Sequence, residues 1–130
     1  MRKIILDTNF LLIPIQFKVD IFSEIDRICS FNYKLCIFEQ TIAELNNIIE
    51  NQQGKDKKAA QFALKIIKSK KIELIKSEAK DVDCLIFKYP DKDAIIATLD
   101  LPLKRKLLDK RISVIFLRQK KYLQLIDRSY

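Results

Sequence analysis

Short apolar segments that alternate with amphipathic ones most restrict the fold of this sequence. Five short segments consist mainly of apolar residues, as buried strands do: 3–6, 34–38, 72–75, 94–99 and 113–117. Between them, apolar residues recur at the spacing of one helix face: 19–29, 41–52, 57–70, 81–89 and 101–110. Apolar strands that alternate with helices form a parallel sheet covered on both faces. We therefore expect an α/β fold in which residues 1–130 form a single three-layer domain around a central, mostly parallel sheet.

Length and composition exclude several classes of protein. A chain of 130 residues can bury one core but not two. Its apolar stretches are shorter than the ~18 residues of a membrane span, and Asp7 and Asn9 interrupt the first of them. We therefore expect a cytoplasmic protein with no membrane partner. Cys29, Cys36 and Cys84 adjoin apolar residues and have no C-x-x-C spacing, which indicates buried thiols and not a disulfide framework or a zinc site.

Two residue types are almost or entirely missing, and this narrows the chemistry. The sequence has no histidine and one glycine, Gly54, which excludes Ser-His-Asp or Cys-His catalysis and a Gly-rich phosphate loop. Any catalysis by ionisable groups must then use carboxylates, lysines, tyrosines or thiols. The net charge of +8 favours a polyanionic partner, although lysines that only solvate a helix face give the same excess.

Four acidic residues are expected at one edge of the sheet. Asp7 and Asp100 end apolar segments, while Glu44 and Asp83 fall in the first turns of predicted helices, with Thr41 and Glu44 in capping-box register. Ligands of open parallel sheets bind at this carboxyl edge. Each acid alone suits a helix cap, but four together repel one another unless a hard divalent cation binds among them. Capping and metal binding both remain open, and one carboxylate can do both.

These acids lie in segments that resemble the ordered motifs of a known family. ILDTNFLL, TIAEL, VDCLI and IIATLD followed by LKRKL are similar to motifs of the PIN domain family, and the resemblance is closest to its rRNA-processing nuclease branch. It implies a metal-dependent endoribonuclease that cleaves single-stranded RNA. The implied site residues are these: Asp7, Glu44, Asp83 and Asp100 as catalytic ligands of Mg²⁺ or Mn²⁺, with Asn9 and Thr98 forming hydrogen bonds around them. Val82 stands where the family often has another acid, which favours one metal ion over two.

RNA next to a group of carboxylates needs a positive rim. The expected RNA-binding residues follow Asp100 and the last predicted strand: Lys104, Arg105 and Lys106 after Asp100, and Arg118, Lys120 and Lys121 after segment 113–117. The lysines of segment 57–70 fit a solvated helix face better. Tyr89 and Tyr122 are candidates for stacking on bases, although core or interface packing explains each of them better. The apolar stretch 11–17 suits core packing or a homodimer face.

Other functions begin with a similar sequence. Phosphatases of the haloacid dehalogenase type also place an Asp after the first strand, but they need a second Asp where Asn9 stands. A response-regulator receiver would need paired acids after the first strand. Within the PIN resemblance, three settings remain open: RNA or rRNA processing, a ribonuclease toxin with an antitoxin partner, and an inactive RNA-binding scaffold of a ribosome-assembly particle.

Overall fold

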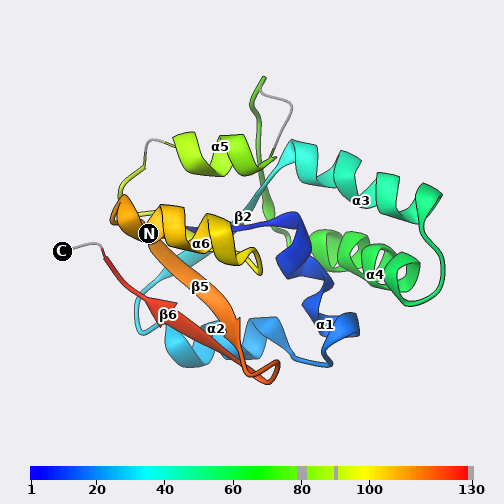
Figure 1. Ribbon diagram of the computed structural model, residues 1–130, viewed down its shortest axis with the longest axis horizontal. Coiled ribbons are helices and arrows are strands. Elements are labelled where there is room, and N and C mark those ends of the chain that lie inside the picture. Colours follow the sequence, from blue (N-terminus) through cyan, green and yellow to red (C-terminus); the bar gives the residue numbers. More distant parts are fainter. Residues whose placement is uncertain (79–81, 90, 129–130) are drawn as a thin grey trace.

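The computed structural model describes residues 1–78, 82–89 and 91–128, and leaves the side chains at positions 83, 87 and 88 undescribed. Within these residues, six strands form one sheet in the order β3-β2-β1-β4-β5-β6 (Figure 1). The strands are β1 (Arg2–Leu6), β2 (Tyr33–Phe38), β3 (Glu73–Ile75), β4 (Ile95–Ala97), β5 (Ser113–Arg118) and β6 (Tyr122–Ile126). The helices are η1 (Thr8–Leu12), α1 (Ile13–Gln16), α2 (Ile21–Ile28), α3 (Glu39–Asn51), α4 (Lys55–Ser69), α5 (Val82–Lys88) and α6 (Leu101–Asp109).

Strands β1 to β5 run parallel to their neighbours, as the sequence predicts. Strand β6 pairs antiparallel with β5, with Arg118 opposite Tyr122, and was not predicted from the sequence. The turn that joins them holds Gln119 and Lys120 at φ of 53° and 56°. Glycine or asparagine normally fills such left-handed positions. Neither residue is present at 119 or 120, so the sequence contains no signal for this turn.

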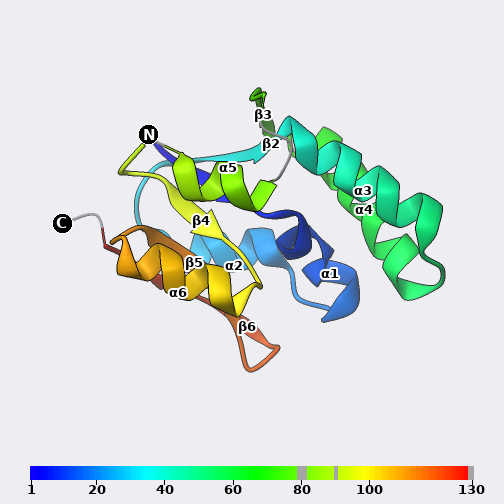
Figure 2. The same ribbon diagram turned by 45° about the horizontal axis from the view of Figure 1, so that its top comes forward.

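The sheet separates two helical layers (Figure 2). Along β1, Ile4 and Leu6 face one side and Ile5 faces the other, as the alternation of side chains in a strand requires. The side of Ile5 packs against α5 and α6. The side of Ile4 packs against η1, α1, α2, α3 and α4, and α3 and α4 pack against each other at one end of the molecule (Figure 1). The predicted three-layer α/β architecture is therefore confirmed.

The apolar stretch 11–17 belongs largely to the core. Leu11 and Ile13 are fully buried, and Leu12 is nearly so. Ile15 and Phe17 are partly buried against the same core cluster. The stretch forms the end of η1 and then α1, two short helices that its spacing did not predict. Core packing thus accounts for most of its apolar residues, and the homodimer stays a prediction.

Two of the three thiols are buried, as their apolar neighbours in the sequence predict, whereas Cys84 is not fully buried. Cys29 and Cys36 are buried and free, and Cys84 is free and partly exposed. Burial raises the pKa of both the Cys29 and the Cys36 thiol to about 11, so both stay protonated at neutral pH. In the part of the chain described here, no helix has the length and apolar composition to cross a membrane.

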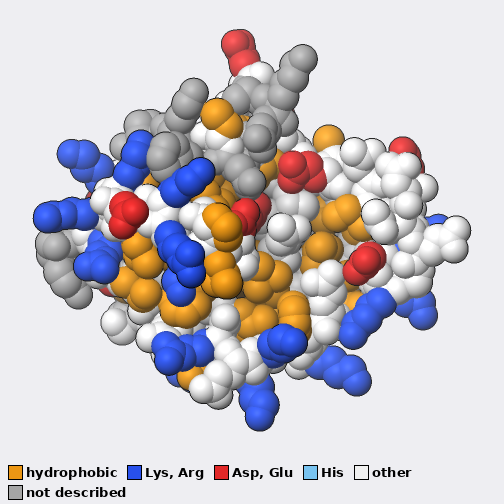
Figure 3. Space-filling view, in the orientation of Figure 1, with side chains coloured by type: hydrophobic (Ala, Val, Ile, Leu, Met, Phe, Trp, Pro, Cys, Tyr) orange, Lys and Arg blue, Asp and Glu red, His pale blue; other side chains and the backbone are white. Residues whose placement is uncertain are grey.

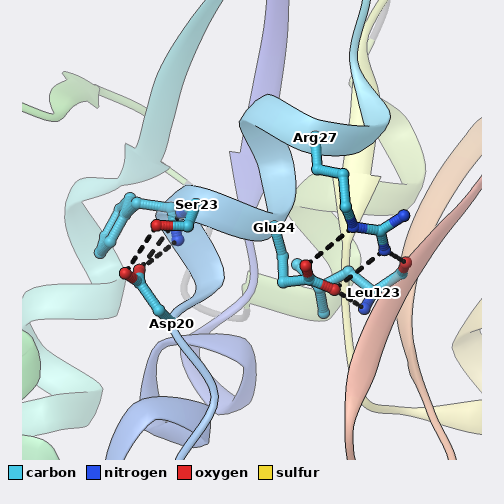
Figure 4. A network of polar contacts seen from close by, with 6 residues as sticks. Asp20, Ser23, Glu24, Arg27 and Leu123 are labelled. Atoms are coloured by element: carbon cyan, nitrogen blue, oxygen red, sulfur yellow. Dashed lines mark hydrogen bonds and ion pairs between the residues drawn. The ribbon is translucent and has the colours of Figure 1, made fainter.

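A charged pair on α2 fixes the antiparallel strand that the sequence did not reveal (Figure 4). The Glu24 carboxylate accepts a 2.9 Å hydrogen bond from the backbone N–H of Leu123 in β6. Arg27 donates to both oxygens of Glu24 at 2.9 Å and to the Leu123 carbonyl at 3.1 Å. Asp20 caps the helix by accepting from the N–H groups of Phe22 and Ser23, each at 3.2 Å. The hydrogen bond from Arg27, with that from Leu123, lowers the pKa of Glu24.

We predict that Glu24→Ala lowers the free energy of unfolding by about 1–2 kcal/mol, because Leu123 and Arg27 lose their acceptor. Because the pKa of Glu24 is lowered in the folded state, this contribution is full above the ordinary value of 4.5 and disappears as the pH falls through the folded-state pKa. Urea unfolding at a series of pH values measures it. Glu50→Ala, at an exposed site on α3, is the control. Equal losses of unfolding free energy in Glu24→Ala and Glu50→Ala would contradict the role of Glu24. So would a difference in unfolding free energy between Glu24→Ala and the unaltered protein that does not become smaller in acid.

Candidate active site

Asp7 lies where the central strand β1 ends. Its backbone N–H donates to the Ala97 carbonyl of β4 at 2.9 Å, which extends the strand pairing by one residue. Its side chain is only 3% exposed. Oδ1 accepts from the Thr8 N–H at 2.8 Å and so caps η1, while Oδ2 accepts from the Thr98 hydroxyl at 2.8 Å. Both oxygens are therefore held by the fold.

Thr98 joins Asp7 to Asp100. Its hydroxyl donates to Asp7 and also accepts from the Asp100 N–H at 3.0 Å. The side chain is 1% exposed. Asp100 caps α6 by accepting from the Leu103 N–H at 3.0 Å, with Pro102 in the first turn. Thr98 therefore links Asp7, at the end of β1, to the N-cap residue of α6.

Thr8 joins Asp7 to Glu44, and the sequence analysis missed it. The Thr8 hydroxyl donates to Glu44 Oε1, and it lies 3.2 Å from the Thr41 hydroxyl. Asn9, which was expected to form such bonds, is exposed and makes none with the described residues. The sequence did contain a signal for Thr8. A threonine that directly follows an aspartate at the end of a buried strand must lie at the same edge of the sheet as that aspartate.

The capping box expected at Thr41 and Glu44 is wrong. Helix α3 begins at Glu39, and its N-cap is Phe38. Thr41 is consequently fully buried inside the first turn, and Glu44 lies beyond that turn. From this position the Glu44 carboxylate accepts the hydrogen bond of the Thr8 hydroxyl and does not cap its own helix.

Asp7 and Glu44 share a pocket of about 360 Å³. Its lining comes from the start of η1 and from one face and the end of α3: Asp7, Thr8, Asn9, Glu44, Asn47, Ile48, Asn51 and Gln52. Asp100 is connected to it through Thr98. Asp83 lies on α5, but its side chain is outside the described residues. Of the described side chains, no three Asp, Glu or Cys are close enough to form a metal site by themselves.

The donor set nevertheless fits a hard divalent cation. Mg²⁺ is usually bound by one or two carboxylates, with water and phosphate oxygens completing the shell. Asp7 and Glu44 supply two carboxylates at the pocket, and Asp100 stands one hydroxyl away from Asp7. None of the described lining residues is a sulfur or nitrogen ligand of the kind that selects zinc or copper.

The expected RNA-binding residues lie on α6 and around the β5–β6 turn. Arg105, Lys106, Arg118, Lys120 and Lys121 are exposed. The Lys104 ammonium lies 3.6 Å from the centre of the Phe116 ring, so part of its side chain is held against β5. Lys and Arg side chains gather over the left and lower parts of the face that Figure 3 shows, and acidic side chains are scattered over its left, centre, top and right. Tyr89 packs edge-on against Phe38, with ring centroids 5.9 Å apart.

The sequence of residues 4–120 matches the family described as PIN like domain. The chain belongs to the PIN-like domain family. Two curated relatives match almost end to end. Ribonuclease VapC4 of Methanocaldococcus jannaschii is 32% identical over 127 residues, covering 96% of this chain and 97% of the relative. Ribonuclease VapC9 of Archaeoglobus fulgidus is 28% identical over 129 residues, covering 97% of this chain and 92% of the relative.

Two solved structures share this PIN-like fold. The structure of the PIN domain endonuclease Utp24 aligns with a TM-score of 0.77 at 22% identity and covers 96% of this chain and 93% of that one. A domain of a functionally unknown protein from Methanocaldococcus jannaschii aligns with a TM-score of 0.60 at 15% identity, covering 91% and 92% of the two chains. These two structural similarities confirm the fold. The family is shown by the match over residues 4–120, and the curated relatives support a nuclease.

We predict that Thr98→Val lowers the free energy of unfolding by about 1–3 kcal/mol, because a buried carboxylate and a backbone N–H each lose their partner. Thr98→Ser keeps the hydroxyl and should retain most of the stability. Chemical denaturation of both variants beside the unaltered protein measures the difference. If valine were as well tolerated as serine, the hydroxyl bridge between Asp7 and Asp100 would not hold the site together.

Proposed function

We propose that this PIN-like protein is a divalent-metal-dependent endoribonuclease that cleaves single-stranded RNA. The observation that carries the proposal is the row of hydrogen bonds Glu44–Thr8–Asp7–Thr98–Asp100 at the carboxyl edge of the central strands. It gathers three acids that are far apart in the sequence, next to a pocket open to solvent. The two curated ribonucleases, similar over nearly their whole lengths, support the same chemistry.

In this proposal Asp7, Glu44 and Asp100 hold Mg²⁺ or Mn²⁺, with Asp83 as the fourth acid of the family pattern. The cation supplies charge neutralisation and lowers the pKa of water. The two threonines position the acids: Thr98 and the Thr8 N–H fix the Asp7 carboxylate, and the Thr8 hydroxyl fixes Glu44. Outer hydrogen bonds of this kind commonly change metal affinity or activity by about 10–100-fold. No histidine base is needed.

The positive rim brings the RNA to these acids. We assign phosphate binding to Lys104, Arg105, Lys106, Arg118, Lys120 and Lys121. Five of them are exposed, and the helix that carries Lys104, Arg105 and Lys106 begins at Asp100. Their charges offset the repulsion between RNA and the carboxylates.

We place this activity in cytoplasmic RNA or rRNA processing, which the ordered motifs of the sequence support. The toxin setting uses the same site and adds an antitoxin that covers it. A small antitoxin gene beside this gene favours the toxin, and its absence favours RNA processing. A catalytically inactive scaffold is the third setting, and metal-dependent cleavage of any RNA would exclude it.

Asp7→Asn should reduce Mg²⁺- or Mn²⁺-dependent cleavage of single-stranded RNA by more than about 100-fold, because the variant loses a charged ligand. The melting temperature should change little, because asparagine keeps the shape of the cap. Cleavage of a labelled oligonucleotide, with and without EDTA, measures the activity. Asp109→Asn, an exposed acid at the end of α6, is the control. An Asp7→Asn protein as active as the unaltered one would remove Asp7 from the site.

The double variant Arg105→Gln, Lys106→Gln should weaken RNA binding and make it less dependent on salt. Losing two phosphate contacts reduces the slope of log affinity against log salt by about 1.4 for single-stranded RNA. Fluorescence anisotropy in EDTA, at several salt concentrations, gives the slope. Lys57→Gln, Lys58→Gln on α4 removes the same charge from an exposed helix and serves as the control. If the slope of log affinity against log salt were the same in the two double variants, Arg105 and Lys106 of α6 would have no specific role in RNA binding.

A further inference from the structure

The pocket extends from the carboxylates along α3 into a region lined by side-chain amides. Glu44, Asn47, Ile48 and Asn51 follow one another at helical spacing, so they share one face of α3. Asn9 and Gln52 complete this part of the lining. One end of the pocket is therefore acidic, and the other presents neutral hydrogen-bonding groups beside the apolar side chain of Ile48.

Two of these amides hold each other in place. Asn51 Nδ2 donates to the Asn47 backbone carbonyl at 3.0 Å and to Asn47 Oδ1 at 3.1 Å. Both N–H groups of Asn51 are thus used, which leaves its Oδ1 as an acceptor and Asn47 Nδ2 as a donor toward a ligand. Because the pair is already ordered, a ligand that binds it loses less side-chain entropy.

The chemistry of this lining selects a nucleobase and not a phosphate. No Lys or Arg is among the described residues that line the pocket, so a phosphate would meet carboxylates and neutral amides alone. A donor beside an acceptor complements a base edge, and asparagine and glutamine pair in this way with adenine. Every base has a donor beside an acceptor on its Watson–Crick edge. Adenine alone also has such a pair on its Hoogsteen edge, because its amino group lies between two ring-nitrogen acceptors, so two of its edges can satisfy both asparagines. Ile48 offers apolar contact to the base.

We propose that Asn47 and Asn51 form a subsite that binds one unpaired base of the RNA next to the carboxylates and prefers adenine. This inference rests on the proposed function, because it assumes that RNA is the substrate. The pocket volume of about 360 Å³ falls within the usual range for small-ligand sites. The amino group of the base donates to Asn51 Oδ1, and Asn47 Nδ2 donates to the adjacent ring nitrogen.

The test compares short uridine oligonucleotides that carry a single central A, C, G or U. Binding is measured by fluorescence anisotropy in EDTA, where metal-dependent cleavage is suppressed, and cleavage of the same RNAs is measured with Mn²⁺. The adenine oligonucleotide should bind about tenfold more tightly than the all-uridine one, in line with the discrimination of a bidentate pair. The preference should shrink to within twofold in Asn47→Ala and in Asn51→Ala.

Asn46→Ala is the matched control, because Asn46 is the neighbouring exposed asparagine of α3 and does not line the pocket. It should keep the adenine preference, and circular dichroism should show equal helix content in all three variants. Equal affinity for the four RNAs, or equal loss in Asn46→Ala and Asn47→Ala, would overturn the subsite. Adenine-selective binding without cleavage would leave the subsite intact and refute the nuclease. Cleavage of all four RNAs with no base preference in binding would support the nuclease and refute the subsite.

Discussion

The site depends on the hydrogen bonds that hold a buried carboxylate at the end of the central strand. Asp7 is 3% exposed, and a charged group in such a place must be paired or hydrogen-bonded. The chain provides these bonds from its nearest neighbours at the same edge: the backbone of Thr8, which follows β1, and the hydroxyl of Thr98, which follows the paired strand β4. The two strands that form the middle of the sheet thereby fix the first acid.

From Asp7 the arrangement spreads in two directions. Toward α6, the Thr98 hydroxyl also accepts from the Asp100 backbone, so the cap of that helix is tied to the first acid. Toward α3, the Thr8 hydroxyl reaches Glu44, so a helix on the opposite side of the strand end is tied in as well. Three acids that are far apart in the sequence are thus connected through two threonines.

The sequence predicted the parts of this structure that depend on local pattern. Apolar strands and helical spacing gave the parallel sheet and its two layers, and an aspartate before Leu-Pro-Leu marked Asp100 as the cap of α6. Contacts between distant residues were less predictable. The hydrogen bond from Thr8 to Glu44 was not predicted, because the two residues are 36 positions apart in the sequence. Strand β6 depends on Glu24 and Arg27 of α2, and its left-handed turn contains no glycine. The Asp83 side chain, which the family pattern places in the site, lies outside the described residues.

The central claim is that a divalent cation binds at the pocket that Asp7 and Glu44 share, beside Asp100. Paramagnetic Mn²⁺ tests it most directly, because it broadens the NMR signals of nearby backbone amides. Titration of the ¹⁵N-labelled protein with substoichiometric Mn²⁺ should first broaden the amides of Thr8, Glu44 and Asp100, and excess Mg²⁺ should restore them. Broadening that is absent, or that begins at exposed acids elsewhere such as Asp109, would contradict the account.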